Sequence, residues 1–216
     1  MKWSLRSEKY LRYIVPSSLL GTHRTKEILT ASQAVSPTRA DAQDVIITVY
    51  DYDAQYLHSC ALKSVEESFG YRENGRVTWI NVDGIRKSDV EKISTHYVIH
   101  PLTTEDILSI NQRPKKDEIE GTLYCLLNKL YYDEKCHTVE QEQVSIVLGS
   151  EYVITFQEDP QRDVFNPIRE RLAIPNSKLR QRNADYLCYS MLDLIVDNYF
   201  LVMEKLSEQI ETTEEE

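Results

Sequence analysis

The sequence lacks the cysteine and histidine patterns of a disulfide-bonded or zinc-binding protein. Its four cysteines, at positions 60, 125, 136 and 188, include no CxxC pair. A disulfide framework or a zinc knuckle would require paired cysteines, so their scatter argues against both and fits a reducing compartment. The five histidines match no ligand spacing such as HExxH. We therefore do not expect Cys and His to form a metal site.

Glycine is scarce, and long apolar runs are missing. The six glycines are isolated, so the sequence has no glycine-rich loop to cradle a phosphate and no GxSxG nucleophile turn. We find no window approaching the 18 apolar residues that a membrane-spanning helix requires, and the first residues lack the apolar core of a secretory signal. We expect the chain as given to be soluble, and we find no catalytic arrangement in it.

Charge is unevenly distributed along the chain. The net charge is −10, yet residues 1–40 contain seven Lys/Arg against two acids, so the remainder carries about −15. A strongly acidic body disfavours nucleic acid as a partner and favours cations. We expect residues 1–43 to be a weakly ordered basic extension. The alternative is a basic arm that touches anionic lipid or an acidic neighbouring subunit.

Hydrophobic periodicity predicts strands and helices in a mixed order. Strands are expected at 45–50, 55–62, 77–82, 123–132, 139–148 and 151–156, the last two joined by a tight turn at Gly149-Ser150. Helices are expected at 64–69 (ended by Gly70), from Ser88 (with Ser88 and Glu91 as a capping box), from Pro101, from about 163–166, and from Asn183 to Glu216. This order predicts an α+β, three-layer α/β/α domain over 44–182, with a mixed parallel and antiparallel sheet covered by helices. Residues 183–216 form a long acidic helix leading out of it.

The stretch HPLTTEDILSINQRPK at 100–115 places two acids on a short helix. Pro101 suits the first helical position, His100 is expected to cap the helix, and Pro114 discourages helix beyond it. From spacing alone, the favoured interpretation is that Glu105 and Asp106 lie near the positive end of the helix dipole.

The last helix carries an acidic stripe beside its apolar stripe. At about 100° per residue, six carboxylates fall within an arc of roughly 60°. Like charges one turn apart each destabilise a helix by a few tenths of a kcal/mol, so bound cations would stabilise this one. A solvated acidic face is the equally weighted alternative. The helical pattern still runs at Glu216, which suggests that the natural helix continues. The six acids are Asp193, Asp197, Glu204, Glu208, Glu211 and Glu215.

Carboxylates are therefore the candidate ligands. Glu105 with Asp106, and Asp193 with Asp197, are the two pairs that we select as metal-site residues. Oxygen-only ligands suit hard cations such as Mg²⁺, which keeps several waters and needs only one or two carboxylates directly.

Several short patterns in series resemble one family. From about residue 77 to 216, their order and spacing resemble the cytoplasmic domain of the CorA-type magnesium transporters. The patterns are WINVDG at 79–84, the stretch at 100–115, QVSI at 143–146, FQE at 156–158, RER at 169–171, ADYL at 184–187 and DNYF at 197–200.

This resemblance implies a regulatory domain of a membrane transporter and not an enzyme. In such a family five identical subunits assemble, and Mg²⁺, with Co²⁺ or other divalent cations as possible ions, binds between neighbouring cytoplasmic domains and holds the pore closed. The resemblance gives Glu105 and Asp106 to one interfacial site and places Asp193 near a second. It implies an inner-membrane protein with this portion on the cytoplasmic side. The stalk helix, the two membrane helices and a Gly-Met-Asn tripeptide would follow Glu216, and they are missing from the sequence.

Two other functions compete with this one. The first is a soluble oligomerisation or cation-binding module without transport. The second is a metal-dependent hydrolase that uses Asp106, Glu105 and the Asp193 and Asp197 pair, although no His or Lys is placed for proton transfer.

Overall fold

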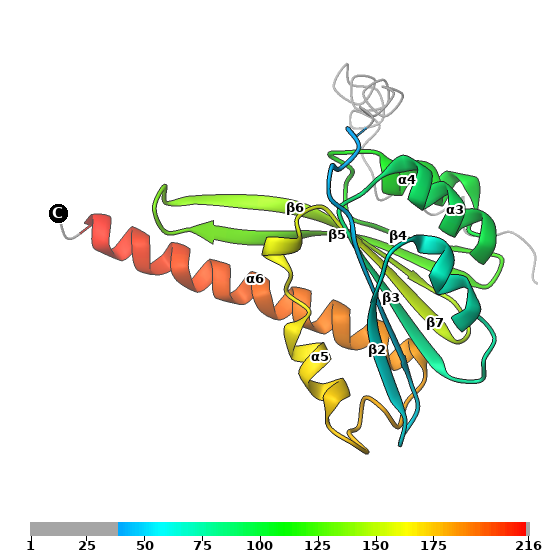
Figure 1. The fold of residues 1–216 in the computed structure, drawn as a ribbon. Helices are drawn as coiled ribbons and strands as arrows, with labels where there is room; N and C mark the ends of the chain where they lie inside the picture. The colour runs from blue at the N-terminus through cyan, green and yellow to red at the C-terminus, as the bar shows by residue number, and fades with distance from the viewer. Residues whose placement is uncertain (1–38, 215–216) are drawn as a thin grey trace, which may run out of the picture. The chain divides into compact units, whose positions relative to one another are not determined.

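The computed structural model describes residues 39–214, which form a seven-stranded sheet with helices on both faces (Figure 1). The expectations for residues 1–38 lie outside the described part of the chain. The strands lie in the order β2-β1-β3-β7-β6-β5-β4. They are β1 Ile46–Tyr52, β2 Leu57–Leu62, β3 Val77–Asp83, β4 Lys115–Ile119, β5 Thr122–Asp133, β6 Thr138–Leu148 and β7 Tyr152–Gln157.

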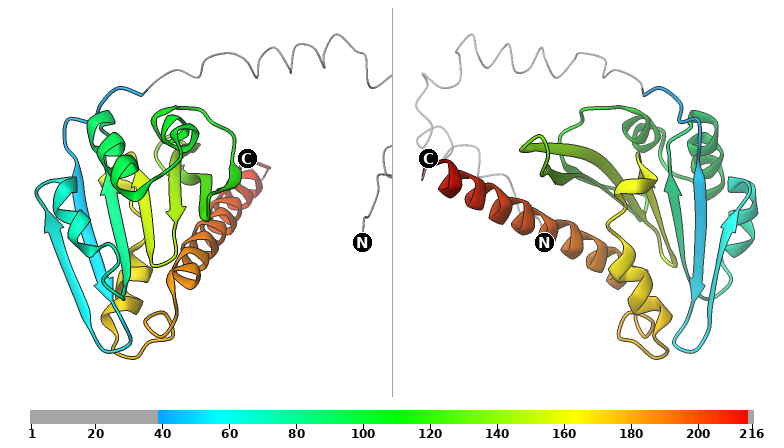
Figure 2. Two further views of the ribbon diagram at one scale, coloured as in Figure 1. Left: turned by 90° about the vertical axis from the view of Figure 1, so that its right-hand side faces the viewer. Right: turned by 60° about the vertical axis from the view of Figure 1, so that its left-hand side comes forward.

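The helices lie in two layers, which confirms the three-layer α+β prediction. One group covers one face of the sheet and consists of the 3₁₀ helix η2 (Val65–Tyr71) with α3 (Lys87–Tyr97) and α4 (Pro101–Leu108). The opposite face carries α5 (Asn166–Ala173) and the long α6 (Ala184–Glu214), and the short η3 (Pro160–Arg162) precedes α5 (Figure 2).

Burial on both faces explains why the central strands are almost continuously apolar. Strands β3 and β7 pair in parallel, whereas every other pair in the sheet is antiparallel. Side chains alternate along each strand, so Trp79 packs in the core beneath α5 and α6 and Ile80 in the core beneath α3. Val153 and Ile154 of β7 repeat this alternation. A mixed sheet follows from this central parallel pair.

Four local predictions are corrected by the structure. Helix α3 begins at Lys87, and its first turn is capped by Asp41, whose Oδ1 accepts a hydrogen bond from the Lys87 N–H at 2.7 Å. The capping box of Ser88 and Glu91 is therefore wrong, because the cap comes from a segment 46 residues away. Helix η2 runs through Gly70 to Tyr71, and the turn between β6 and β7 has three residues. Strand β4 was not predicted, because its sequence KKDEI is polar and it pairs only with β5 at the edge of the sheet.

Strands β5 and β6 form a long ribbon that extends beside α6 (Figure 1). The side-chain amide of Asn198 donates to the Leu130 carbonyl at 2.6 Å, and the Tyr132 hydroxyl donates to Gln209 Oε1 at 3.5 Å. Near the end of the ribbon, Lys205 Nζ lies 3.9 Å from Glu134 Oε1. These contacts hold the outer part of α6 along the ribbon.

Helix α6 is the one described helix that is long and apolar enough to cross a membrane by length and composition, over Ala184–Thr212. No such window was expected from the sequence. In the first part of the helix, Leu187, Met191 and Ile195 are fully buried in the core on the α5 and α6 face of the sheet, whereas Phe200, Leu201, Met203 and Ile210 further along are exposed. We therefore assign the first part of α6 to the core of this domain.

Gly84 should tolerate no side chain. It follows β3 at φ +87°, and a Cβ there would lie 2.3 Å from the Asp44 carbonyl oxygen. Replacement by alanine combines a left-handed backbone with a backbone clash, so we expect Gly84→Ala to lower the free energy of unfolding by about 3 kcal/mol. Urea unfolding monitored by circular dichroism measures this change.

Gly75→Ala is the matched control. Gly75 also has a positive φ, of +78°, but a Cβ there would meet no atom within 4 Å. We expect a loss of only about 1 kcal/mol from the backbone conformation alone. Equal losses in the two variants would show that the close approach of residue 44 is not what requires glycine at position 84.

Candidate functional site

Helix α4 begins as the sequence predicts, but it places its two acids differently. Pro101 is the first residue, and His100 caps the helix by accepting a hydrogen bond from the Leu102 N–H on Nδ1 at 3.2 Å. The helix has eight residues, so Glu105 and Asp106 are its fifth and sixth, and its first turn contains no acid. A carboxylate in the second half of a helix lies toward the negative end of the dipole. The dipole interpretation of these acids is therefore wrong, and their presence needs another reason.

Asp106 is held by a lysine that follows in the chain. Lys115 Nζ, at the start of β4, lies 2.5 Å from Asp106 Oδ2, and the Asp106 side chain is 17% exposed. Glu105 is exposed and makes no ion pair among the residues that the structure describes. Sequence reasoning missed the role of Lys115 because the pairing depends on the turn through Pro114 and not on any helical or strand period.

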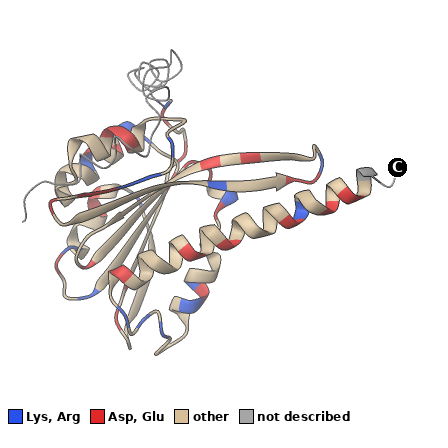
Figure 3. Cartoon of the chain, turned by 180° about the vertical axis from the view of Figure 1, so that it is seen from behind, with Lys and Arg blue, Asp and Glu red and all other residues tan. Residues whose placement is uncertain are grey.

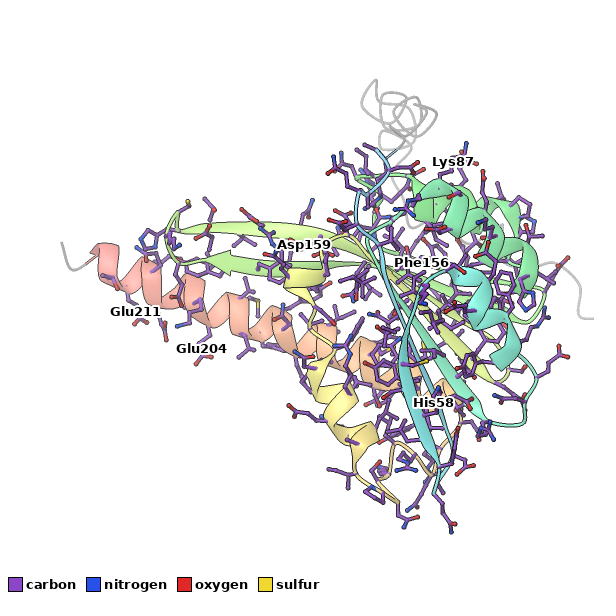
Figure 4. All side chains as sticks on the ribbon, viewed as in Figure 1. His58, Lys87, Phe156, Asp159, Glu204 and Glu211 are labelled. Atoms are coloured by element: carbon purple, nitrogen blue, oxygen red, sulfur yellow. The ribbon has the colours of Figure 1, made fainter. Side chains whose placement is uncertain are left out.

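Asp193 and Asp197 lie one turn apart on the exposed side of α6. Asp193 Oδ1 accepts a hydrogen bond from the Tyr189 hydroxyl at 3.5 Å. Figure 3 shows acidic residues recurring along α6, and Glu204 and Glu211 project on the side away from the β5–β6 ribbon (Figure 4). Lysine interrupts this acidic stripe at one point, where Lys205 Nζ lies 3.4 Å from Glu208 Oε2.

The sheet separates the two pairs of predicted ligands. Glu105 and Asp106 lie on α4 over one face, and Asp193 and Asp197 lie on α6 over the other (Figure 2). Within residues 39–214, no three His, Cys, Asp or Glu side chains gather into a group that could hold a metal ion. One chain therefore brings each pair together but does not combine the two pairs.

A buried polar network lies at the carboxyl ends of the parallel strands β3 and β7. Asp83 accepts hydrogen bonds from the side-chain amides of Asn81, at 2.7 Å, and Gln157, at 2.9 Å. Lys129, which is fully buried, donates to Gln157 Oε1 at 3.1 Å and lies 3.4 Å from Glu142 Oε2. Lys129 and Glu142 stand directly opposite each other in the β5–β6 register. The network thus connects four strands, β3, β7, β5 and β6, and Lys129 with Glu142 is the charged pair within it.

The same network reaches α5 through Arg169. Its guanidinium pairs with Asp163, donates to the Tyr50 hydroxyl at 2.9 Å and lies 5.2 Å from the centre of the Trp79 ring. Burial raises the pKa of Asp83 to about 6, and the nearby carboxylate of Asp163 adds to this rise. Burial lowers the pKa of Lys129, and the charge of Glu142 opposes that fall. Several residues of the sequence patterns therefore serve the fold and not a cation site.

Comparison with known proteins identifies the family. Residues 74–216 match the model of the family described as CorA-like Mg²⁺ transporter protein. Over 175 residues the chain is 38% identical to the cobalt/magnesium transport protein CorA of Thermotoga maritima, covering 81% of this chain and 50% of that protein. This chain belongs to the CorA-like family of Mg²⁺ transporter proteins. The resemblance found in the sequence is confirmed.

Solved structures share the fold of this CorA-like chain at low sequence identity. The full-length CmaX protein matches with a TM-score of 0.60 and 11% identity, over 82% of this chain and 53% of that one. The soluble domain of CorA from Methanocaldococcus jannaschii matches with a TM-score of 0.56 and 16% identity, over 82% of this chain and 65% of that one. The chain spans about half the length of the Thermotoga relative.

The raised pKa of Asp83 predicts a pH dependence of stability. The Asp83 pKa is about 6 in the folded chain, against about 3.9 for an unperturbed aspartate. Between about pH 4 and pH 6 the folded state retains a proton that the unfolded state has lost, so the free energy of unfolding falls as pH rises. Relative to Asp83→Asn, the wild-type stability should fall by about 2 kcal/mol across this window.

Urea unfolding from about pH 4 to about pH 8 measures the difference between the two proteins. If the wild-type chain gained stability over Asp83→Asn as pH rose from 4 to 6, the sign of the Asp83 effect would be contradicted.

Proposed function

We propose that this chain is the cytoplasmic Mg²⁺-sensing domain of a CorA-type divalent-cation channel, gated by ions bound between subunits. The placement of the four predicted ligands is the observation that most strongly supports this proposal. Both acidic pairs lie at the surface, on opposite faces of one sheet, and the described chain does not combine them. An ion held by both pairs therefore needs two subunits. Membership in the CorA-like family gives the class of protein in which such an ion would act.

The physical mechanism follows from carboxylates that face each other across a subunit interface. Without a cation, two such groups a few Å apart repel and destabilise the closed arrangement. A Mg²⁺ ion supplies two positive charges and accepts oxygen ligands directly or through its waters. Cation binding and subunit closure are then coupled in both directions, so falling Mg²⁺ shifts the population toward separated subunits. Five identical subunits, membrane helices beyond this domain, and Mg²⁺ or Co²⁺ as the ion belong to this proposal.

On the α4 side of the proposed site, Lys115 competes with the cation for Asp106. Its ammonium already neutralises one oxygen of Asp106 at 2.5 Å. A Mg²⁺ ion would therefore bind through the other Asp106 oxygen or through Glu105, or it would displace the lysine. The ion pair stabilises the free site and so opposes cation binding.

The competing functions make different predictions about self-association. A soluble assembly module would associate equally well with or without divalent cations. A hydrolase with two metal ions would need one pocket in which several ligands converge, and the described residues contain no group of three such side chains. Cation-dependent association is therefore the measurement that separates the proposal from the module.

Sedimentation velocity at fixed ionic strength, with Mg²⁺ replacing Na⁺, tests the proposal directly. We expect Mg²⁺ to strengthen self-association of the chain by about tenfold, which corresponds to about 1.4 kcal/mol. Asp106→Asn combined with Asp193→Asn should remove most of this gain, because each side of the bridge loses one of its two carboxylates. Glu170→Gln, an exposed acid on α5 outside both pairs, is the control and should behave like the wild-type chain. Equal Mg²⁺ dependence in the double variant and the wild type would reject the site assignment.

Lys115→Met should make the chain more sensitive to Mg²⁺. Removing the ammonium beside Asp106 leaves a full negative charge for the cation, and a like charge a few Å away no longer repels it. We expect half-maximal association at a Mg²⁺ concentration about threefold to tenfold lower, given the charge interactions near a protein surface. Lys116→Met, at the neighbouring exposed position, is the control. An unchanged or higher Mg²⁺ requirement would show that Asp106 does not hold the ion.

A further inference from the structure

A polar cavity lies at the end of the sheet opposite to the buried polar network. It has a volume of about 350 Å³ and lies among the β1–β2 turn, the start of β3, the β6–β7 turn and the start of α6. The Asn176 N–H donates to the Ala54 carbonyl at 3.2 Å, which joins the α5–α6 connection to the β1–β2 turn. Glu105, Asp106, Asp193 and Asp197 do not line this cavity, so it is separate from the proposed cation site.

Arg180 lines this cavity with an incompletely satisfied guanidinium. The residue is only 4% exposed, and its Nε donates to the Asp53 carbonyl at 3.0 Å. Its Nη2 is buried and has no hydrogen-bond partner in the described chain, and no carboxylate there forms an ion pair with it. Arginine stays charged in proteins, and the charge of nearby Asp53 interacts with Arg180 without forming a salt bridge or occupying Nη2. The side chain therefore has unused capacity for an anion.

Tyr52 provides a second unused donor in the same cavity wall. Its side chain is fully buried at the end of β1, and its hydroxyl has no partner among residues 39–214. Burial raises the pKa of this hydroxyl, so it remains a neutral O–H donor. Buried hydroxyls in folded proteins are nearly always hydrogen-bonded. The two residues that carry these unpartnered donors, Tyr52 and Arg180, both line one cavity.

Of the other two arginines that line the cavity, one is paired with an acid and one is not. Arg76 is already paired with Asp51 at 2.7 Å, whereas Arg182 is exposed and makes no ion pair in the part of the chain that is described. The carboxylate of Asp53 accepts the N–H groups of Gln55 and Tyr56 at 2.8 Å each, and these bonds lower its pKa. This carboxylate is therefore hydrogen-bonded within its own turn. The charges of Arg76 and Arg180 also lower its pKa, although it forms no salt bridge with Arg180.

Helix α6 adds a favourable field at the mouth of the cavity. Asn183, which immediately precedes the helix, lines the cavity, and its carbonyl accepts the Tyr186 N–H at 3.1 Å. The amino end of a helix carries a partial positive charge that favours anions. Glu151, on the β6–β7 turn, is exposed and also lines the cavity. Its carboxylate opposes this field and has no partner among the residues that the structure describes.

We propose that this cavity binds a small oxyanion, namely the phosphate group of inorganic phosphate or of a small phosphate ester. Arg180 and Tyr52 donate hydrogen bonds to its oxygens, and Arg182 with the amino end of α6 supplies positive potential. A guanidinium matches two oxygens of one anion at once, which favours phosphate over a halide ion. The cavity is larger than a phosphate group alone, so a short ester substituent also fits.

Isothermal titration of the 216-residue chain with inorganic phosphate tests this proposal, with chloride keeping the ionic strength constant and no divalent cation present. We expect saturable binding to the wild-type chain. Tyr52→Phe should weaken it by about tenfold, the effect of one lost hydrogen bond, and Arg180→Gln should abolish it. Tyr52→Phe should leave the phosphate-free unfolding temperature unchanged or raised, because its hydroxyl has no partner in the fold. This variant therefore keeps the test valid even if Arg180→Gln destabilises the chain.

Tyr124→Phe is the matched control, since Tyr124 is a buried tyrosine of the same sheet that does not line the cavity. It should bind phosphate as the wild-type chain does. A parallel titration with glycerol phosphate distinguishes the two sources of the phosphate group by which ligand binds more tightly. The proposal fails if phosphate does not bind the wild-type chain, or if it binds Tyr52→Phe and Arg180→Gln as tightly as the wild-type chain.

Discussion

The pairing of buried charges at the carboxyl ends of β3 and β7 is the constraint on which the arrangement of this domain depends. Lys129 has no exposed surface, and its ammonium is stabilised by Glu142, by Gln157 and by the Arg162 carbonyl. Removing one partner would leave an uncompensated charge in the core, which is among the most destabilising changes a domain can undergo. Through Arg169 and Asp163 the same network fixes α5 against the sheet. It thereby sets where the chain turns toward α6.

The sheet that this network organises also decides how the acidic side chains can act. Because α4 and α6 cover opposite faces, Asp106 and Asp193 of one chain are separated by the full thickness of the core. In the function proposed above, each side of the domain supplies half of a cation site, and the ion binds between copies of the chain. Lys115 pairs with one of these acids, Asp106, in the free domain. Under this proposal, affinity for the ion depends on a competition between that internal ion pair and the intersubunit bridge.

The wrong sequence predictions have different physical causes. The capping box at Ser88 failed because Asp41, distant in sequence, supplies the cap of α3. The dipole interpretation of Glu105 and Asp106 failed because His100 already caps α4 and the acids follow in its second half. Strand β4 was missed because an edge strand needs no apolar face. The cap of α3 and the pairing of β4 with β5 thus come from partners brought by the tertiary fold, whereas the position of the two acids depends on the short length of α4.

The sequence by itself determined the order and type of nearly all elements, the mixed three-layer class and the family. These follow from hydrophobic periodicity and from short patterns that are local in the chain. Only the tertiary structure decided which side chains meet. It paired Lys115 with Asp106, buried Lys129 beside Glu142, and brought Tyr52 and Arg180 to one cavity. Such contacts join residues that are far apart in sequence or separated by an irregular turn, and their distances are set by packing, which no periodicity encodes.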